Sequence, residues 1–383
     1  MHVFIITQYF PPEVGAAASR WGDFSKILVN SEHKVTVLCE APHYPLSNYY
    51  KGYKNSFSKI EKHNENLIVI RSLAYASNRK TFYKKIFHYF VFAIGAIFNV
   101  RKIKNYDLLI ISSPPLFTGL VGIFIRFIYK KRFWLDLRDL WPDSALELGQ
   151  IKKGFLYSIG KKLEKKIYES AEGFIFPVPG FKRYLESFPE KISKKPMIEL
   201  MNGVSKDFIN KSKSCKISND SKFTVLYSGN MGLAQDLETI IKSALLLEKY
   251  DIEFRFIGDG VKKTKIKSLA SKSAKKIHFH KSVSRDDLIK FIKKASICLV
   301  PLKEKKIFES ALPSKMFEYM ACEKPIIVSV KGEAKKIVEL SKAGTVIEPE
   351  NAQILSKAIL SYFNNKDKCK EHGKNGMMYV TKN

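Results

Sequence analysis

The sequence predicts an α/β protein built from two doubly wound parallel sheets in tandem. Short apolar segments alternate with longer segments of helical spacing along the whole chain, as in strand–helix–strand units. With 383 residues, 45% of them hydrophobic, the chain is long enough to bury two cores. The loops that follow parallel strands gather at one edge of each sheet. We therefore expect a ligand cleft where the two domains face each other.

Six strands are expected in each half of the chain. In the first half they are residues 3–7, 34–39, 67–71, 108–112, 132–137 and 173–177. In the second half they are residues 224–228, 253–258, 276–280, 297–301, 325–329 and 344–348. The join is expected just after Asn202 and Gly203, because residues 205–222 are rich in Ser, Lys and Asn with little apolar periodicity. The predicted domains are 1–203 and 204–365, followed by a C-terminal segment, 366–383.

The chain is strongly basic, with 66 Lys and Arg against 37 Asp and Glu, a formal net charge of +29. The excess is shared almost equally by the two halves, which argues against a single nucleic-acid-binding arm. Such a field attracts anionic lipid surfaces, phosphorylated substrates or nucleic acid, and charge alone does not choose among them. The five cysteines are odd in number and include no C-x-x-C pair, which argues against a disulfide framework and a zinc site and favours a reducing compartment.

Two apolar stretches, 86–98 and 116–129, are shorter than the roughly 20 residues that cross a bilayer. The first lies between Lys84–Lys85 and Arg101–Lys102. This pattern is typical either of a helix that binds the first domain to an anionic membrane leaflet or of a core helix with basic ends. We favour the helix that binds the membrane surface.

Two loops of the first domain contain candidate binding residues. Gly15 precedes an expected helix, where small residues allow close approach to a phosphate or sugar hydroxyl, although any first strand–helix connection favours such residues. No G-x-G-x-x-G is present, so a dinucleotide site is disfavoured. Arg138 and Asp139 end a buried strand and either hold a substrate or pair with each other to fix the loop. There is no D-x-D, so nothing indicates a metal that bridges carboxylates to a diphosphate.

Two segments of the second domain indicate a phosphate site. The turn Gly229-Asn230-Met231-Gly232 follows a strand, and its backbone N–H groups are predicted to cradle a phosphate at a helix start. Ser314 is predicted to cap the next helix, which puts Lys315 in the first turn. A cation is unfavourable there unless an anion is bound, which indicates a diphosphate. Glu318, one turn deeper, either accepts ribose hydroxyls or faces solvent.

Six segments together resemble one enzyme family. They are Y-F-P-P-E-x-G-A-A at 9–17, D-L-R-D-L-W-P-D at 136–143, M-N-G-V at 201–204, Y-S-G-N-M-G-L-A-Q at 227–235, I-G-D-G at 257–260 and L-P-S-K-M-F-E-Y-M-A-C-x-K-P-I-I at 312–327. The chain is similar to family 4 retaining glycosyltransferases of GT-B fold, in particular the bacterial L-fucosamine-type transferases of O-antigen and capsule synthesis. The resemblance implies a nucleotide-sugar donor, usually UDP-linked, held by the second domain. It also implies an acceptor held by the first domain, retention of configuration, and no metal or cofactor.

The same resemblance assigns roles to residues. Ser314, Lys315 and the 229–232 turn would hold the diphosphate, Glu318 the ribose, and Gly15 would approach the donor phosphate from across the cleft. Arg138 stands where many relatives have His, so with Asp139 it would contact the transferring sugar or the acceptor. Ser310 occupies the place of the first of two glutamates found in many relatives, and Glu309, one residue away, is the nearby candidate for donor binding. Chains of this family usually finish with a helix that crosses back to the first domain, and segment 366–383 would be a shortened form of it.

We therefore predict a cytoplasmic glycosyltransferase, peripheral at the inner face of the cell membrane, that binds no nucleic acid. It would transfer a sugar to a polyprenyl-diphosphate-linked glycan during surface-polysaccharide assembly. Two alternatives stay open: a nucleotide-sugar 2-epimerase of similar fold, and a non-catalytic basic module that binds anions.

Overall fold

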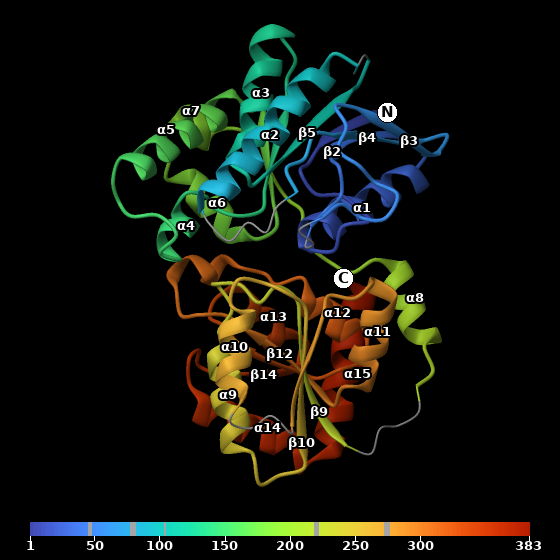
Figure 1. Cartoon of the computed structure of the whole chain (residues 1–383), viewed down its shortest axis with the longest axis vertical. Coiled ribbons are helices and arrows are strands. Elements are labelled where there is room, and N and C mark those ends of the chain that lie inside the picture. The colour runs from blue at the N-terminus through green and yellow to red at the C-terminus, as the bar shows by residue number, and fades with distance from the viewer. Residues whose placement is uncertain (45–47, 77–81, 103–104, 218–221, 272–275) are drawn as a thin grey trace. The chain divides into compact units, whose positions relative to one another are not determined.

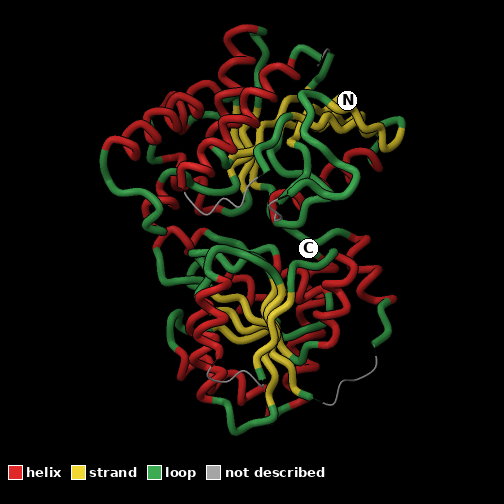
Figure 2. The backbone as a smooth tube through the Cα atoms, in the orientation of Figure 1, coloured by secondary structure: helices red, strands yellow, loops and turns green. Residues whose placement is uncertain are grey.

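The computed structural model describes residues 1–44, 48–76, 82–102, 105–217, 222–271 and 276–383. The chain divides into two compact units, Met1–Met201 and Asn202–Asn383, each containing one sheet with helices packed on it (Figures 1 and 2).

Unit 1 contains an eight-stranded sheet in the order β3-β4-β2-β1-β5-β6-β7-β8, parallel except for β3, which pairs antiparallel with β4. Its strands are β1 His2–Ile6, β2 Lys34–Glu40, β3 Lys59–Asn64, β4 Leu67–Ser72, β5 Leu108–Ser113, β6 Trp134–Leu137, β7 Gly173–Phe176 and β8 Met197–Glu199. Its helices are α1 Ala16–Asn30, α2 Phe82–Val100, α3 Leu116–Ile128, α4 Asp143–Glu147, α5 Phe155–Ser170, α6 Pro179–Glu186 and α7 Glu190–Ser193.

Close helix packing in unit 1 depends on glycine at one contact. α3 lies beside α2 and α5, and a Cβ on Gly119 of α3 would lie 2.6 Å from Cδ1 of Ile167 on α5. A larger residue at 119 would therefore push the two helices apart.

Unit 2 contains a six-stranded parallel sheet in the order β11-β10-β9-β12-β13-β14. Its strands are β9 Phe223–Ser228, β10 Ile252–Ile257, β11 Ile277–His280, β12 Ile297–Pro301, β13 Ile326–Ser329 and β14 Gly344–Val346. Its helices are α8 Lys206–Ser214, α9 Leu237–Leu246, α10 Lys263–Ala270, α11 Arg285–Lys294, the 3₁₀ helix η2 Lys306–Ser310, α12 Lys315–Ala321, α13 Glu333–Ser341, α14 Ala352–Phe363 and α15 Lys366–Lys382.

The strand order of unit 2 reverses at β9. The chain moves outward from β9 through β10 to β11, then returns to the other side of β9 as β12 and continues to β14. Because parallel crossovers are right-handed, α9 and α10 cover one face of the sheet and α11, α12 and α13 the other. Ligands of such sheets bind outside the carboxyl ends of the strands at the reversal, and the 229–232 turn follows β9 there.

The predicted α/β class and all twelve predicted strands are confirmed, with boundaries within two residues. Two strands were missed. β3 carries charged, mostly exposed side chains on the edge of the sheet, so it has no apolar run. β8 has only three residues, two of them exposed.

Segment 366–383 forms α15 inside unit 2. It packs on α12, α13 and α14, and a Cβ on Gly373 would lie 2.2 Å from the carbonyl oxygen of Glu323. Segment 366–383 was predicted to be separate from the second domain. In the structure it is part of unit 2.

Candidate functional site

Helix α12 is fixed to the end of β9 through Tyr319. The backbone N–H of Ser228 donates to the Tyr319 hydroxyl at 2.8 Å, and the Ser228 hydroxyl lies 2.9 Å from the same oxygen. Lys315 is one turn earlier on the same face of the helix, and its Nζ lies 4.0 Å from the ring centroid of Tyr227. The ammonium group is thus held against an aromatic face at the carboxyl edge of the sheet.

Gly229 leaves the space that Lys315 occupies. A Cβ at residue 229 would lie 2.9 Å from Nζ of Lys315 and 3.3 Å from its Cε. The φ angle of Gly229 is +121°, a conformation that side-chain-bearing residues rarely adopt. Two segments that are 86 positions apart in the sequence therefore meet, and glycine is required at one of them.

Lys315 is half-buried, and no carboxylate lies within 4.0 Å of its Nζ among the described residues. Desolvation lowers the pKa of Lys315 to about 7, and the nearby Glu318 carboxylate only partly opposes this shift. An amine in this state gains from an anion that neutralises it. Lysines with strongly lowered pKa values concentrate at functional sites.

Glu318 faces a cation, not bulk solvent. Its side chain is 16% exposed, and its Oε1 lies 3.7 Å from Nε of Arg285, the first residue of α11. Arg285 in turn stacks over the ring of Phe208. A ribose that hydrogen-bonds to Glu318 would share the carboxylate with this arginine.

Two details of the predicted phosphate site need correction. Ser314 precedes α12 as expected, but its side chain caps no backbone N–H. The 229–232 turn does not start a helix, because α9 begins only at Leu237.

The N–H groups of the 229–232 turn are also largely engaged. Those of Gly229, Met231 and Gly232 donate to Ile257, Asp259 and Gln235. The structure therefore gives the turn a different role from a phosphate cradle: it makes room for Lys315.

Glu309 lies on η2 and is exposed. It lines a pocket of about 150 Å³ with lysines 303, 305, 306 and 331. Neither Lys315 nor Glu318 lines this pocket.

Arg138 of unit 1 is bonded to the end of β5. Its Nε donates to Ser112 Oγ at 2.7 Å and its Nη2 to the carbonyl of Pro114 at 2.6 Å. The described residues show no ion pair between Arg138 and Asp139; Asp136, at 3.9 Å, is the carboxylate near Arg138. Asp136 itself is buried and accepts hydrogen bonds from Arg20, Trp21 and Ser112. The Arg138 side chain thus fixes the loop that leads into α3.

Asp139 is exposed and lines a pocket of about 170 Å³ between α2, the start of α3 and α4. Tyr89, Phe117 and Trp141 contribute aromatic walls, and Lys85 also lines the pocket. Aromatic faces beside a carboxylate suit a sugar ring, whose hydroxyls need a polar partner and whose C–H faces stack on aromatic rings.

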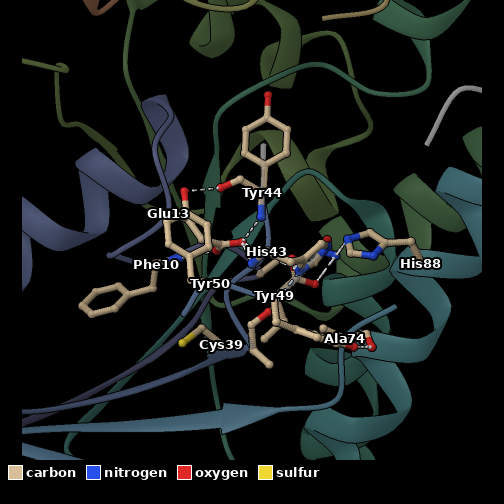
Figure 3. A network of polar contacts seen from close by, with 12 residues as sticks. Phe10, Glu13, Cys39, His43, Tyr44, Tyr49, Tyr50, Ala74 and His88 are labelled. Carbon is tan, nitrogen blue, oxygen red and sulfur yellow. Dashed lines mark hydrogen bonds and ion pairs between the residues drawn. The ribbon is translucent and has the colours of Figure 1, made fainter. Parts of the chain in front are cut away.

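Gly15 immediately precedes α1, and a Cβ there would lie 3.3 Å from the Tyr44 ring. Two residues earlier, the buried Glu13 carboxylate accepts hydrogen bonds from the backbone N–H groups of Phe10, His43 and Tyr44 (Figure 3). Burial, followed by the neighbouring Glu40, raises the pKa of Glu13 to about 8.

Sequence reasoning missed the buried network to which Glu13 belongs. Its other members, Gln8, Glu40, His43 and His88, come from three separate segments and form no spacing motif. The only available signal was polar residues directly after the buried strands β1 and β2.

Among the comparisons with known proteins, the match to a protein-family model lies within unit 2. Residues 209–377 match the family model described as "Glycosyl transferases group 1". This part of the chain is a group 1 glycosyltransferase domain. Together with the two parallel-sheet units, it makes the fold GT-B.

Relatives and solved structures match over most of the chain. The chain is 21% identical over 378 residues to the putative colanic acid biosynthesis glycosyl transferase WcaI of Escherichia coli K12, covering 94% of this chain and 91% of that protein. It superposes on sucrose-phosphate synthase from Thermosynechococcus elongatus with a TM-score of 0.75 at 17% identity, covering 100% of this chain and 94% of that one. It also superposes on Anabaena Alr3699/HepE in complex with UDP-glucose, with a TM-score of 0.67 at 12% identity and coverage of 100% and 95%. At these identities the structural likeness shows the fold.

Proposed function

We propose that this glycosyltransferase takes its sugar from a UDP-linked donor whose diphosphate binds Lys315. The observation that carries the proposal is the half-buried Lys315 ammonium at the carboxyl edge of the unit 2 sheet, with no carboxylate within 4.0 Å among the described residues and a glycine beneath it. A diphosphate would supply the missing counter-charge, and Glu318 would then receive the ribose. The solved complex of a structural neighbour with UDP-glucose favours uridine as the base.

The chemistry follows from the charge that develops. Cleavage of a glycosyl diphosphate builds negative charge on the leaving UDP, and a preplaced ammonium stabilises that charge more in the transition state than in the ground state. The departing phosphate oxygen takes the proton of the acceptor on the same face of the sugar, so configuration is retained without a protein nucleophile. The reaction then needs neither metal nor cofactor.

For the acceptor we propose a lipid-linked glycan of surface-polysaccharide synthesis. The aromatic pocket beside Asp139 would hold its terminal sugar. The name of the E. coli relative, which refers to colanic acid biosynthesis, favours this class of acceptor.

A surface on unit 1 supports association with an anionic membrane. Helix α2 buries Phe92, Ala93 and Ala96, yet exposes Phe87 (51%), Phe90 (47%) and Phe98. Exposed basic residues flank it at Lys84 and at residues 101–102. The start of α5 repeats the pattern, with exposed Phe155, Leu156 and Ile159 beside lysines 152, 153 and 162. No described helix has the length and apolar character of a membrane span. Apolar rings among lysines are typical of interfacial binding.

The donor proposal is tested by thermal shift with UDP. Wild type and a Lys335→Met control, which changes an exposed lysine on α13, should both be stabilised, whereas Lys315→Met should not. Equal shifts in all three proteins, or no shift in wild type, would contradict the proposal. A panel of UDP-sugars with a polyprenyl-diphosphate-linked glycan then tests transfer, and an arm with donor alone detects epimerisation.

The membrane proposal is tested by sedimentation with phosphatidylglycerol vesicles. Phe87→Ser/Phe90→Ser should reduce binding, while the control Leu340→Ser, at a residue 76% exposed on unit 2, should not. Binding should also weaken as salt rises. Salt-independent binding, or equal binding of both variants, would refute the proposed surface.

A further inference from the structure

A cluster of metal-binding residue types lies buried inside unit 1, and none of its members is used above for donor or acceptor binding. Glu40 ends β2, and His43 follows it by three residues. His88, which is labelled with His43 in Figure 3, projects from α2. All three side chains have zero exposure. One ligand atom from each lies within 4.8 Å of the others.

The separations approach those of a metal coordination sphere. Nε2 of His88 lies 3.2 Å from Oε2 of Glu40. Nδ1 of His43 lies 3.6 Å from Oε1 of Glu40 and 3.0 Å from the carbonyl oxygen of Ala41. Tetrahedral bonds of about 2.0–2.1 Å to zinc place neighbouring ligand atoms about 3.3–3.4 Å apart. The two observed distances to Glu40 bracket this value, and on ligation Nδ1 of His43 would exchange its contact with the Ala41 carbonyl for the ion.

The backbone orients His88 for ligation. Its Nδ1 lies 3.1 Å from the carbonyl oxygen of Tyr75. When Nδ1 carries the hydrogen and donates it to this carbonyl, the lone pair of the neutral ring is on Nε2, which faces Glu40. Zinc-ligating histidines are commonly held in this way, with the second ring nitrogen bonded to a backbone carbonyl or a carboxylate.

Gln8, directly after β1, offers a fourth ligand. Its Nε2 lies 2.9 Å from Oε2 of Glu40 and contacts Nε2 of His88. Its Oε1 is buried and has no hydrogen-bond partner within the part of the chain that the structure describes. The nitrogen and oxygen of a glutamine amide are distinguished only by their partners. Turning the amide by 180° would place the unpartnered oxygen beside Glu40 and His88, where a cation would satisfy it.

We infer that Gln8, Glu40, His43 and His88 form a zinc site. Two imidazoles and a carboxylate match the ligand preference of Zn²⁺, and a set of four protein ligands without an open position is characteristic of a structural site. The ion would tie the ends of β1 and β2 to α2. The cysteine pattern of the sequence argued against zinc, but no cysteine is needed here, and the ion takes no part in the proposed transfer.

The test is zinc content. The full chain is purified without a polyhistidine tag, equilibrated with zinc sulfate, separated from unbound metal by gel filtration and analysed by atomic emission. Wild type should retain about one zinc ion per chain. Glu40→Gln and His88→Gln should each lose most of it. The control His63→Gln, at a half-exposed histidine elsewhere in unit 1, should keep it.

Thermal unfolding provides a second readout that does not depend on the variants folding. Zinc should raise the Tm of chelator-treated wild type. Cobalt(II) in place of zinc should give visible absorption bands of tetrahedral coordination. Wild type that retains less than about a tenth of an ion and shows no change in Tm would overturn the inference and leave a sealed hydrogen-bond network. Zinc content equal in wild type and both cluster variants would also overturn it.

Discussion

The binding of UDP should depend on pH through Lys315. In the free protein the pKa of Lys315 is about 7, because desolvation disfavours its charged form. A diphosphate beside the amine would hold it protonated over the whole neutral range. The free lysine is about nine-tenths protonated at pH 6 and about one-tenth protonated at pH 8. Binding at pH 8 must therefore add the proton first.

The size of the change in UDP affinity follows from these protonated fractions. Affinity for UDP should fall about tenfold between pH 6 and pH 8, or about 1.4 kcal/mol, with about 0.9 proton taken up per UDP bound at pH 8. Isothermal titration calorimetry at pH 8 in buffers of different ionisation enthalpy measures this uptake.

The pH dependence of folding stability gives an independent check. UDP affinity should fall as pH rises, whereas the contribution of Lys315 to stability should increase. A lysine whose pKa is lowered by folding binds its proton more tightly in the unfolded chain, so its contribution to stability rises as pH increases from about 7 toward 10.5. Lys315→Met removes a desolvated amine and keeps a similar length, so the variant should unfold at an equal or higher temperature while losing UDP binding. Equal UDP affinity at pH 6 and pH 8, or no proton uptake by the wild-type protein on binding UDP at pH 8, would refute the assignment of the diphosphate to this lysine.

Three further predictions concern other residues. Gly229→Ala should destabilise unit 2 by about 1–3 kcal/mol in urea unfolding and weaken UDP binding, because the methyl group would lie 2.9 Å from Nζ of Lys315 at a φ of +121°; unchanged UDP affinity would show that this contact is unimportant. Asp139→Asn should lower kcat/KM for transfer at least about tenfold without changing UDP affinity, and a parallel loss of UDP binding would remove Asp139 from the acceptor side. With chelator present, wild-type stability should fall by a few kcal/mol as pH rises from about 4.5 to about 8, because folding raises the pKa of Glu13. Glu13→Gln should flatten this dependence, and an identical pH profile in both proteins would contradict it.

The fold was predictable because its strands are buried on both faces and therefore appear as uninterrupted apolar runs. All twelve such runs are strands. β3 was not predicted because an antiparallel edge strand can be charged, and here residues 59–64 are mostly exposed. β8 was not predicted because three residues are too few to show a periodic pattern.

The candidate site was only partly predictable. Lys315 was singled out because a cation in a first helical turn is locally unfavourable, and such a conflict is visible in the sequence. The pairing of Glu318 with Arg285 was not visible, because it depends on α11 packing beside α12. Arg138 and Asp139 are adjacent in sequence but have different environments. The Arg138 side chain is hydrogen-bonded to Ser112 at the end of β5, whereas Asp139 lines a pocket. Side-chain direction at a strand end is set by tertiary contacts, which residue types alone do not specify.

The contact between Gly229 and Lys315 explains why the two motifs of unit 2 belong together. A small residue after β9 is usually attributed to a phosphate that approaches the backbone, but here three N–H groups of that turn are already bonded to protein. What the glycine leaves open is the space above it, and the lysine occupies that space with its ammonium at the carboxyl edge of the sheet. Anion attraction at this edge would therefore come mainly from one side chain and not from a ring of backbone dipoles. A lysine is a point charge whose protonation responds to its surroundings, whereas backbone N–H groups are not titratable. The pH dependence of UDP binding consequently distinguishes the two designs, and a site built on the turn alone would show none between pH 7 and pH 9.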